Sequence, residues 1–555
     1  MIRLFVALLA LFVATPATAQ GVVASADPRA TEAGRDILRQ GGTAADAAMA
    51  MMLALTVVEP QSSGFGGGGF IIHHGGKTGL LESIDGREKA PAAARPDRFL
   101  TPDGKPMGFR QAVPGGLSVG VPGNIRLAAM THAKWGKLEW RALFQPAIKL
   151  AEDGFEVTKP LNGAAGYFPE LWKNFPDIAA LYLGPDGKPL PVGTRIRNPA
   201  LAKFLRDIAE GGPDAFYTGP NAQAIVDAVT KAPANPADMT LADLAAYQAK
   251  ERPPVCGGYR GYTVCGMGPP SSGAITILQM LGMIERFDLN RLGPKSPVAW
   301  HVLGEAMQLA YADREMYLGD RDFVDVPIAG LIDPGYLGKR SKLIAERRAL
   351  NDYQPGTPPG ARPRTLAVQA ETPGTTHFVA VDRDGNIASM TSTVEGPFGS
   401  QLIANGLVLN NELTDFTYVP ERDGAPVANR VEGGKRPLSS MSPTIVYDRA
   451  GKPVLALGSA GGKRIIMHVM KTLVGVLDFG LSAEEAMALP NLYFGGGKLL
   501  IEDNELGKQL APEIARLGQD TQASDLGSKL TVLQRGPDGW RGAADPRSIG
   551  TALTE

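Results

Sequence analysis

Two adjacent threonines, Thr375 and Thr376, follow a glycine in the segment PGTTHFVAVD and open a run that alternates like a β-strand. A threonine hydroxyl is a weak nucleophile until a base removes its proton. At a chain N-terminus the α-amine, with a pKa of about 7.7–8.0, can be that base. Cleavage of the Gly374–Thr375 bond would therefore turn Thr375 into a nucleophile. Because the amine supplies a base, we interpret nearby His377 as structural.

The residues that follow predict a partner for Thr375. The run THFVAVDRDGNIASMTST contains two alternating stretches around Asp384-Gly385, which is typical of a β-hairpin. A turn centred there places Thr393 opposite Thr375, with Cβ atoms about 4.5–5.5 Å apart, so Thr393 would hold the nucleophile by a hydrogen bond. Glu395 lies two residues further and projects from the same face. Two threonines at a strand start are also common for structural reasons, since threonine favours strands.

The composition is that of a soluble globular protein. Of 555 residues, 44% are hydrophobic and 20% are charged, and 56 Lys and Arg balance 57 Asp and Glu. This balance gives no reason to expect nucleic acid or an anionic membrane as a partner. The phosphate-binding pattern G-x4-G-K-[ST] fails at Lys77 and Lys463, because Ile71 and Leu457 stand where glycine is required.

Residues 1–19 predict a secretory signal peptide. Arg3 precedes an apolar run from Leu4 to Val13, and Ala17-Thr18-Ala19 forms an A-x-A cleavage pattern. The run is shorter than the roughly 20 apolar residues that span a bilayer. We therefore expect an exported protein, periplasmic or secreted, with no membrane anchor after cleavage; a retained anchor is the alternative.

The two cysteines, Cys256 and Cys265, would face each other if Arg260-Gly261 forms a two-residue hairpin turn. An exported protein meets an oxidising compartment, so the sequence leaves open either a disulfide or two free buried thiols. No histidine lies near the pair to complete a zinc site. Adjacent His73 and His74 point to opposite faces of a strand, so we expect surface positions and no metal or cofactor.

Helical and extended patterns occur in blocks. Residues 43–60 predict a mostly buried helix, with Thr43 as N-cap and Asp46 in the capping-box position. Residues 120–350 read as mostly helical, whereas strands dominate the last third of the chain. This arrangement predicts an α+β fold in which helices cover stacked sheets. Residues 351–374 are rich in Pro, Gly, Thr and Ala, which is typical of a linker.

An ordered set of motifs resembles the γ-glutamyltransferases, also called γ-glutamyltranspeptidases or glutathione hydrolases, which belong to the N-terminal-nucleophile hydrolases. The motifs are VVEPQSSGFGGGGF, DGREKAP, VPGNIRLAAM, YRGYTV, PPSSGAITILQML, TTHFVAVDRDGN, NNELTDF, KRPLSSMSPTIV, GSAGGKRII and AADPRSIG. The resemblance implies a four-layer αββα sandwich built from a large subunit, residues 20–374, and a small subunit, residues 375–555, cut from one precursor. Residues 351–374 would then be a cleavage loop.

The resemblance also implies transfer of a γ-glutamyl group from glutathione-like donors to water, an amino acid or a dipeptide. Thr375 would form a γ-glutamyl ester, and Thr393 would support it. Gly461 and Gly462, in SAGGK, would form an oxyanion hole, because two successive N–H groups can point at one oxygen. From the residues alone, this glycine pair is more simply a turn.

A γ-glutamyl donor carries an α-carboxylate and an α-ammonium. The resemblance assigns Arg87 to the carboxylate, which a guanidinium binds through two hydrogen bonds, and Ser439 and Ser440 would add hydroxyl donors. Taken alone, Arg87 reads as a surface residue. Three acids near one site repel each other, so a bound cation gives them a reason to lie together. The acids that would surround the ammonium are Glu395, Glu412 and Asp415.

Two features depart from the family pattern. Some members have Asn at the position of Glu395, though others have Glu. Residues 416–438 are shorter than the corresponding segment in members with a long lid loop and longer than in lidless members. The sequence leaves open whether Tyr418 or another residue covers the site, and with it the balance of hydrolysis and transfer.

Two alternative functions remain. A glutaryl or cephalosporin acylase of the same fold would also use Thr375 and self-cleavage, but a glutaryl group has no α-ammonium for the acids to bind. An exported binding protein for glutamyl compounds would never be cleaved, and a denaturing gel would show one band. We predict the γ-glutamyl enzyme.

Overall fold

The computed structural model describes residues 20–366, 374–495 and 497–555. The predicted signal peptide and residues 367–373 of the predicted cleavage loop lie outside the described residues. Within the described part of the chain, no helix is long and apolar enough to cross a membrane.

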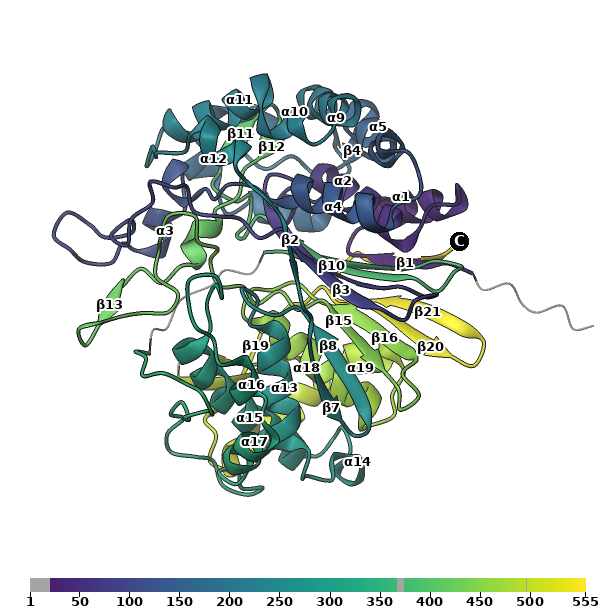
Figure 1. Ribbon diagram of the computed structural model, residues 1–555, viewed down its shortest axis with the longest axis vertical. Coiled ribbons are helices and arrows are strands. Elements are labelled where there is room, and N and C mark those ends of the chain that lie inside the picture. Colours follow the sequence, from purple (N-terminus) through teal and green to yellow (C-terminus); the bar gives the residue numbers. More distant parts are fainter. Residues whose placement is uncertain (1–19, 367–373, 496) are drawn as a thin grey trace, which may run out of the picture.

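Two antiparallel sheets stack face to face between two helical layers, which is the predicted αββα sandwich (Figure 1). In the order of hydrogen-bonded neighbours, the first sheet contains β22 (Thr551–Thr554), β1 (Val22–Ser25), β9 (Thr376–Val381), β10 (Ile387–Thr393), β2 (Gly68–His74), β3 (Leu81–Asp85) and β6 (Lys250–Arg252). The second contains β21 (Gly539–Ala544), β20 (Thr531–Gly536), β16 (Pro453–Gly458), β15 (Thr444–Tyr447), β8 (Tyr262–Gly266) and β7 (Val255–Tyr259).

Alternation along the central strands divides the core into layers. In β9, Phe378 and Ala380 join the core under the first helical layer, whereas Val379 and Val381 pack between the two sheets. Successive strand side chains point to opposite faces, so one continuous apolar run fills both layers. By the same alternation, Thr375 belongs to the side that faces the second sheet.

The first helical layer is built on α2 (Ala44–Val58), whose residues are all buried. Thr43 and Asp46 form the predicted capping box at its start, a feature worth about 1 kcal/mol. The other helices on this side are α1 (Pro28–Arg39), α3 (Phe109–Ala112), α4 (Asn124–Trp135), α5 (Gln145–Asp153), α6 (Lys159–Ala165), α7 (Pro169–Trp172), α8 (Pro176–Tyr182), α9 (Pro199–Gly211), α10 (Asp214–Tyr217), α11 (Gly219–Thr230) and α12 (Leu241–Ala245).

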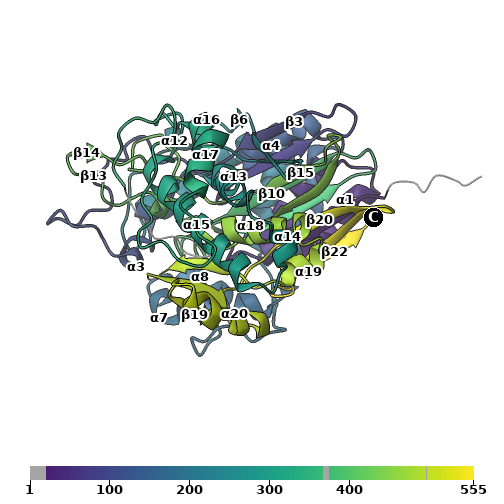
Figure 2. The same ribbon diagram turned by 90° about the horizontal axis from the view of Figure 1, so that it is seen from below.

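The second helical layer combines helices from both sides of the predicted cleavage point (Figure 2). Helices α13 and α18 pack together in one core, so the two predicted subunits share it. The helices are α13 (Gly273–Ile284), α14 (Leu289–Leu292), α15 (Pro297–Tyr317), α16 (Ile328–Leu331), α17 (Pro334–Ser341), α18 (Arg464–Leu477), α19 (Ala483–Ala488) and α20 (Glu505–Arg516).

Short strands lie outside the sandwich. The predicted strand GLVLNN forms only the short β12, and the mostly helical middle also contributes strands to both sheets. The short strands are β4 (Phe155–Glu156), β5 (Arg195–Ile196), β11 (Ile403–Ala404), β12 (Leu407–Val408), β13 (Glu421–Arg422), β14 (Ala425–Pro426), β17 (Leu492–Gly495), β18 (Lys498–Glu502) and β19 (Thr521–Ser524).

The β7–β8 hairpin settles the cysteine question. Cys256 and Cys265 are cross-strand partners and form a disulfide, and Arg260 and Gly261 make the turn with φ values of 52° and 83°. The predicted pairing geometry is therefore confirmed.

The expected surface positions of His73 and His74 are wrong. Both belong to β2 and are buried, at 4% and 5% exposure, because the first sheet is covered by helices on one face and by the second sheet on the other. His73 stacks on Trp135 at 4.2 Å, and burial lowers its pKa to about 4. Its ring is therefore neutral and part of the core.

Candidate active site

The predicted site residues meet at one end of the sandwich because each lies at or near a strand end. Thr375 precedes β9, Thr393 ends β10, Arg87 follows β3, Ser439 and Ser440 precede β15, and Gly461 and Gly462 follow β16. All of these except Gly461 line one cavity of about 20 Å³, room for little more than a water molecule. The full lining is Arg87, Thr375, Thr393, Glu395, Glu412, Asp415, Ser439, Ser440, Met441, Gly462 and Ile465.

Thr375 occupies the predicted place opposite Thr393. The β9–β10 register pairs Thr376 with Ser392, and the Oγ1 atoms of Thr375 and Thr393 lie 3.1 Å apart. Thr393 Oγ1 accepts a hydrogen bond from the Glu395 amide at 2.8 Å, so its own hydrogen can be donated to Thr375. The predicted support of the nucleophile is present in the geometry.

The backbone of Thr375 is strained. Its φ is +85°, a left-handed value that is unusual for a β-branched residue and costs about 1–3 kcal/mol. The strain is held because the Thr375 amide donates to Ser62 O at 3.0 Å and the Gly374 carbonyl accepts from the Gly461 amide at 3.2 Å. The bond between Gly374 and Thr375 is thus fixed on both sides.

Only glycine fits at position 374. A Cβ added there would lie 1.6 Å from the Glu395 carbonyl oxygen, far inside van der Waals contact. Any larger residue would push the carbonyl of residue 374 away from Gly461. The close approach explains in physical terms why a glycine stands before Thr375.

The glycine pair forms the turn between β16 and α18. Gly461 and Gly462 have φ values of 132° and 58°, which a residue with a side chain rarely adopts. Gly461 directs its N–H at the Gly374 carbonyl, and Gly462 lines the cavity. The turn stands beside the start of a long helix, whose N-terminal N–H groups favour negative charge.

Arg87 is buried and surrounded by acceptors. It is 1% exposed and donates from Nη1 to Glu412, from Nη2 to Asp415 at 2.5 Å, and from Nε and Nη2 to the carbonyls of Pro437 and Leu438. Burial opposes the charged form, but the neighbouring carboxylates outweigh it and raise the pKa of Arg87. The alternative of a solvated surface arginine is therefore wrong.

Glu88 also belongs to this cluster and was not among the predicted site residues. It is fully buried, its carboxylate lies 3.8 Å from Arg87 Nη1, and neither of its oxygens has a hydrogen-bond partner among the described residues. Burial raises the pKa of Glu88 to about 7 and that of Glu412 well above its usual range. A proton shared between these two neighbouring carboxyls would supply the missing bond. The signal was its place beside Arg87 in DGREKAP.

Glu395 lies beyond the end of β10, with φ +75°, and still reaches the cavity as predicted. Asn411 donates to its carboxylate. Glu412 and Asp415 come from the 3₁₀ helix Glu412–Asp415, and both are buried rather than solvated. Four acids therefore surround Arg87, and even with one proton shared by two of them their negative charge exceeds that of the guanidinium, which favours a cationic ligand group.

A second buried network lies behind Thr375, on the helix side of the sheet. Thr376 Oγ1 donates to Glu59, which also pairs with Lys529 Nζ at 2.8 Å. Lys529 also donates to Ser62 Oγ at 2.8 Å. This network ties the start of β9 to the end of α2, and its residues were not among the predicted ones.

Tyr418 lies at the edge of the site. Its ring stacks on Phe99 with centroids 4.5 Å apart, and burial beside Glu395 and Asp415 raises the pKa of its hydroxyl. The segment beyond it forms the short β13–β14 hairpin.

His377 is buried on the inter-sheet side of β9. Its Nδ1 lies 2.8 Å from Thr391 Oγ1, and burial lowers its pKa to about 3, so the ring is neutral and structural, as interpreted. In the described part of the chain, no group of three or more His, Cys, Asp or Glu residues is arranged to hold a metal ion.

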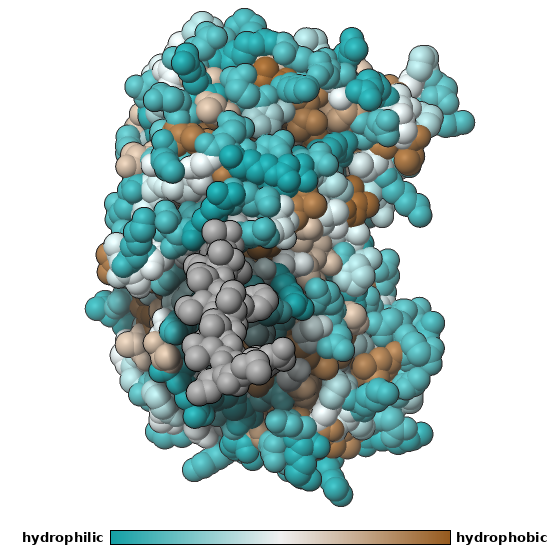
Figure 3. Space-filling model, turned by 90° about the vertical axis from the view of Figure 1, so that its right-hand side faces the viewer, coloured by the Kyte–Doolittle hydropathy of each residue, from teal (hydrophilic) through white to brown (hydrophobic). Residues whose placement is uncertain are grey.

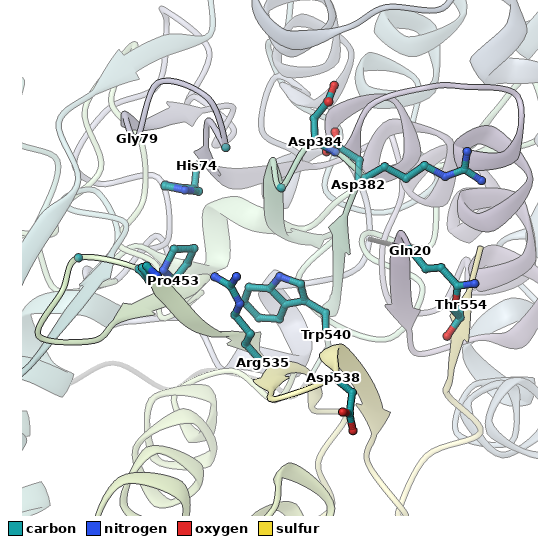
Figure 4. Close-up of a pocket in the computed structure, with 16 residues that line it drawn as sticks. Gln20, His74, Gly79, Asp382, Asp384, Pro453, Arg535, Asp538, Trp540 and Thr554 are labelled. Carbon is teal, nitrogen blue, oxygen red and sulfur yellow. The ribbon is translucent and has the colours of Figure 1, made fainter. Parts of the chain in front are cut away.

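A much larger cavity, of about 850 Å³, lies among the turns at the opposite end of the same sheets (Figure 4). Arg535 and Trp540 come from the β20–β21 hairpin, and Asp382 and Asp384 from the β9–β10 turn. It shares no lining residue with the Thr375 cavity. Outside the grey atoms, the face at this end is mostly hydrophilic (Figure 3).

An αββα sandwich with a threonine at the head of a central strand defines the class of N-terminal-nucleophile hydrolases. The chain is an enzyme of this class, and it belongs to the gamma-glutamyltranspeptidase family, whose model matches residues 30–554.

Proteins similar to this chain include both glutathione hydrolases and acylases. The glutathione hydrolase proenzyme of Escherichia coli (strain K12) is 40% identical over 96% of this chain and 91% of that protein. The acylase ACY 1 proenzyme of Pseudomonas sp. (strain SE83) is 35% identical over 96% of this chain and 93% of that protein. The crystal structure of cephalosporin acylase from Bacillus halodurans superposes with a TM-score of 0.85 and 27% identity, covering 97% of this chain and 96% of that one.

Proposed function

We propose that this protein is a γ-glutamyltransferase and glutathione hydrolase that cuts itself between Gly374 and Thr375. One observation carries the proposal. The strained Thr375 places its hydroxyl beside Thr393 while its preceding carbonyl accepts from Gly461, next to a buried cluster of four acids and Arg87. The first half of this arrangement suits self-cleavage, and the second suits an amino-acid head group.

Self-cleavage uses groups already in place. Thr375 Oγ1 attacks the Gly374 carbonyl carbon, and the oxyanion forms against the Gly461 N–H. The C–N bond then breaks as the proton lost by the Thr375 hydroxyl passes to the amide nitrogen. Water then hydrolyses the resulting ester, leaving a Gly374 carboxylate and a Thr375 α-amine. Release of the left-handed φ at Thr375 favours the reaction by about 1–3 kcal/mol.

Turnover repeats the same chemistry on a donor. The freed amine of Thr375 accepts the hydroxyl proton as Oγ1 attacks the γ-carbonyl, and it returns a proton to the leaving amine. Gly461 and Gly462 stabilise the oxyanion. Water, an amino acid or a dipeptide then resolves the γ-glutamyl ester. No cofactor enters this scheme.

The charge of the cluster supports a donor with an α-ammonium. Glu395, Glu412 and Asp415 surround the ammonium, and Arg87, Ser439 and Ser440 bind the α-carboxylate. In the uncleaved chain Arg87 pairs with Glu412 and Asp415, and the donor's ammonium would compensate these acids in its place. Names of relatives favour an acylase as second candidate, but a glutaryl group would add negative charge without a cation.

The mature protein is proposed to be an exported heterodimer, periplasmic or secreted, freed of residues 1–19. Residues 20–374 form the large subunit and residues 375–555 the small one. The shared core of α13 and α18 would keep the two subunits together after cleavage.

The test combines intact-mass analysis with an assay on glutathione and on a glutaryl-amide substrate. We expect two polypeptides, the smaller beginning at Thr375, and faster release from glutathione. Faster turnover of the glutaryl substrate would favour the acylase, and a single uncut chain without activity would favour a binding protein.

A further inference from the structure

The serine pair proposed to bind the α-carboxylate is held by a buried arginine that has no role so far. Arg314, on α15, is 0% exposed and donates from Nη2 to Ser440 Oγ at 2.8 Å and from Nε to Ser272 Oγ at 2.9 Å. A guanidinium has only hydrogens to offer, so both hydroxyl oxygens act as acceptors. The single hydrogen of Ser440 therefore points away from Arg314.

Ser272, in the PPSSG motif, links Arg314 to Ser439 through hydrogen bonds. Its Oγ and its amide donate to the Ser439 carbonyl at 2.7 and 2.8 Å. Ser271 Oγ donates to the Met441 carbonyl at 2.7 Å, and the Ser439 amide donates to the Pro270 carbonyl at 2.9 Å. The loop of the serine pair is thus fastened along its length to the PPSSG motif.

The residue after Arg314 reaches the other side of the site. Glu315 Oε1 accepts from Arg314 Nη1 at 2.9 Å and from Lys463 Nζ at 2.7 Å. Lys463 directly follows the glycine pair, and Tyr311 donates to its carbonyl. Tyr311, Arg314 and Glu315 are spaced i, i+3, i+4, so they share one face of α15.

We propose that Arg314 and Glu315 are positioning residues for the γ-glutamyl donor. Arg314 orients the hydroxyl of Ser440, and through Ser272 the loop of Ser439, toward the α-carboxylate. Glu315 anchors the turn that carries the oxyanion N–H groups. Because both belong to one helix, α15 sets the distance between the carboxylate end and the γ-carbonyl of the donor. The inference rests on the proposed function.

The first arm of the test replaces Arg314 by lysine, which keeps the positive charge and removes the guanidinium that bonds to both serines. The readouts are kcat and KM for L-γ-glutamyl-p-nitroanilide, and inhibition by L-glutamate and by γ-aminobutyrate, which lacks the α-carboxylate. We expect KM and the glutamate Ki to rise about 10- to 100-fold. The γ-aminobutyrate Ki should stay within about threefold, since it never uses the serines.

The second arm replaces Glu315 by glutamine. This change weakens the contacts of Glu315 with Lys463 and with Arg314 Nη1, and it leaves Arg314 Nε and Nη2 bonded to the serines. We expect kcat to fall about 10- to 100-fold, as for a misplaced oxyanion donor, while the glutamate Ki stays within about threefold. The two variants should therefore separate binding from turnover.

The matched control is Arg340→Lys. Arg340 is also buried and bonds to α15, through the Leu309 carbonyl and Asp313, but on a side away from the site. It should leave the ratio of the two Ki values unchanged. All variants are first checked on a denaturing gel for processing.

An Arg314→Lys protein that binds both inhibitors as before, or loses both equally, would overturn the inference. If that variant fails to fold or to be processed, Ser272→Ala removes the bridge to Ser439 more gently. It should still raise the glutamate Ki selectively, and an unchanged ratio of Ki values would be equally decisive against the inference. A wild-type protein inactive on every γ-glutamyl donor would refute the proposed function instead.

Discussion

The two ends of the sandwich are joined by the same strands, about 20 Å apart along β9, but they treat their charged groups differently. At the hairpin end, Asp382 accepts hydrogen bonds from the backbone amides of Ala44, Asp384 and Asn386, and Lys77 meets Asp384 as an exposed pair. Asp382 is also buried, and burial raises its pKa, but these amides satisfy its carboxylate and close the turn. Exposed pairs such as Lys77 and Asp384 contribute little to stability.

At the other end, the charges are buried and incompletely satisfied. Arg87, Glu88 and Glu412 are at most 1% exposed, and the pKa values of the two acids are raised by burial. The hairpin-end cavity is about 850 Å³ and the Thr375 cavity about 20 Å³. Within the described part of the chain, the two ends therefore differ in whether buried carboxylates have hydrogen-bond partners. We propose the chemistry where both oxygens of Glu88 and one of Glu412 lack them, not at the larger cavity.

The sharpest contrast is expected from Thr375→Ala. Without the hydroxyl neither self-cleavage nor acyl transfer can start, so we expect one uncut chain on a denaturing gel and complete loss of γ-glutamyl hydrolysis. A processed or active variant would show that Thr375 is not the nucleophile, and the Thr375 end would then differ from the hairpin end only in its buried, incompletely satisfied charge.

Arg87→Lys should have the next largest effect. The single ammonium of lysine cannot replace a guanidinium that donates hydrogen bonds to Glu412, Asp415 and a donor carboxylate. KM for γ-glutamyl donors should therefore rise about 10- to 100-fold. Steady-state kinetics checks this, with processing as the control for folding. Unchanged kinetics would take Arg87 out of the site.

The raised pKa of Glu88 predicts a pH-dependent KM. Below about pH 7 Glu88 carries a proton, which it shares with Glu412. This proton must leave before the acids around Arg87 bind the donor's ammonium well. KM should therefore fall about tenfold as pH rises from about 6 to about 8. The glutamate Ki measures the same effect without the titration of the Thr375 amine in turnover.

The control for this prediction is Glu88→Gln, which imitates the protonated state. Its KM should match the wild-type value near the acidic limit and stay flat as pH rises. A wild-type KM that does not change with pH would argue against a role for Glu88 in donor binding.

The smallest effect is expected from Arg535→Ala in the larger cavity. The side chain is exposed, and exposed substitutions away from special features change stability by about 0.5 kcal/mol or less. Processing and kcat/KM should stay within about twofold of wild type. A strong loss of activity would show that the hairpin end takes part in function.

The parts that could be predicted from the sequence were those set by local rules. The Asp384-Gly385 turn fixed the register that brings Thr375 to Thr393. The Arg260-Gly261 turn did the same for the two cysteines, and the capping box marked the start of α2. Each depends on residues close together in the chain.

The parts that failed depend on distant packing. His73 and His74 were expected at the surface because alternation cannot tell that both faces of a sheet are covered. Arg87 and Glu412 are 325 residues apart, and only the family resemblance joined them before the structure did. Arg314 lies in a helix where a charge normally marks the solvated face, so nothing local indicated its burial beside Ser440.

The most direct test of self-cleavage at Gly374–Thr375 is the mass of the polypeptides in a fully active preparation. The proposed mechanism predicts two chains and no intact one, with the amino terminus of the smaller chain at Thr375. Full activity in a preparation that contains only the continuous chain would contradict it, because the amine proposed as the base would not exist.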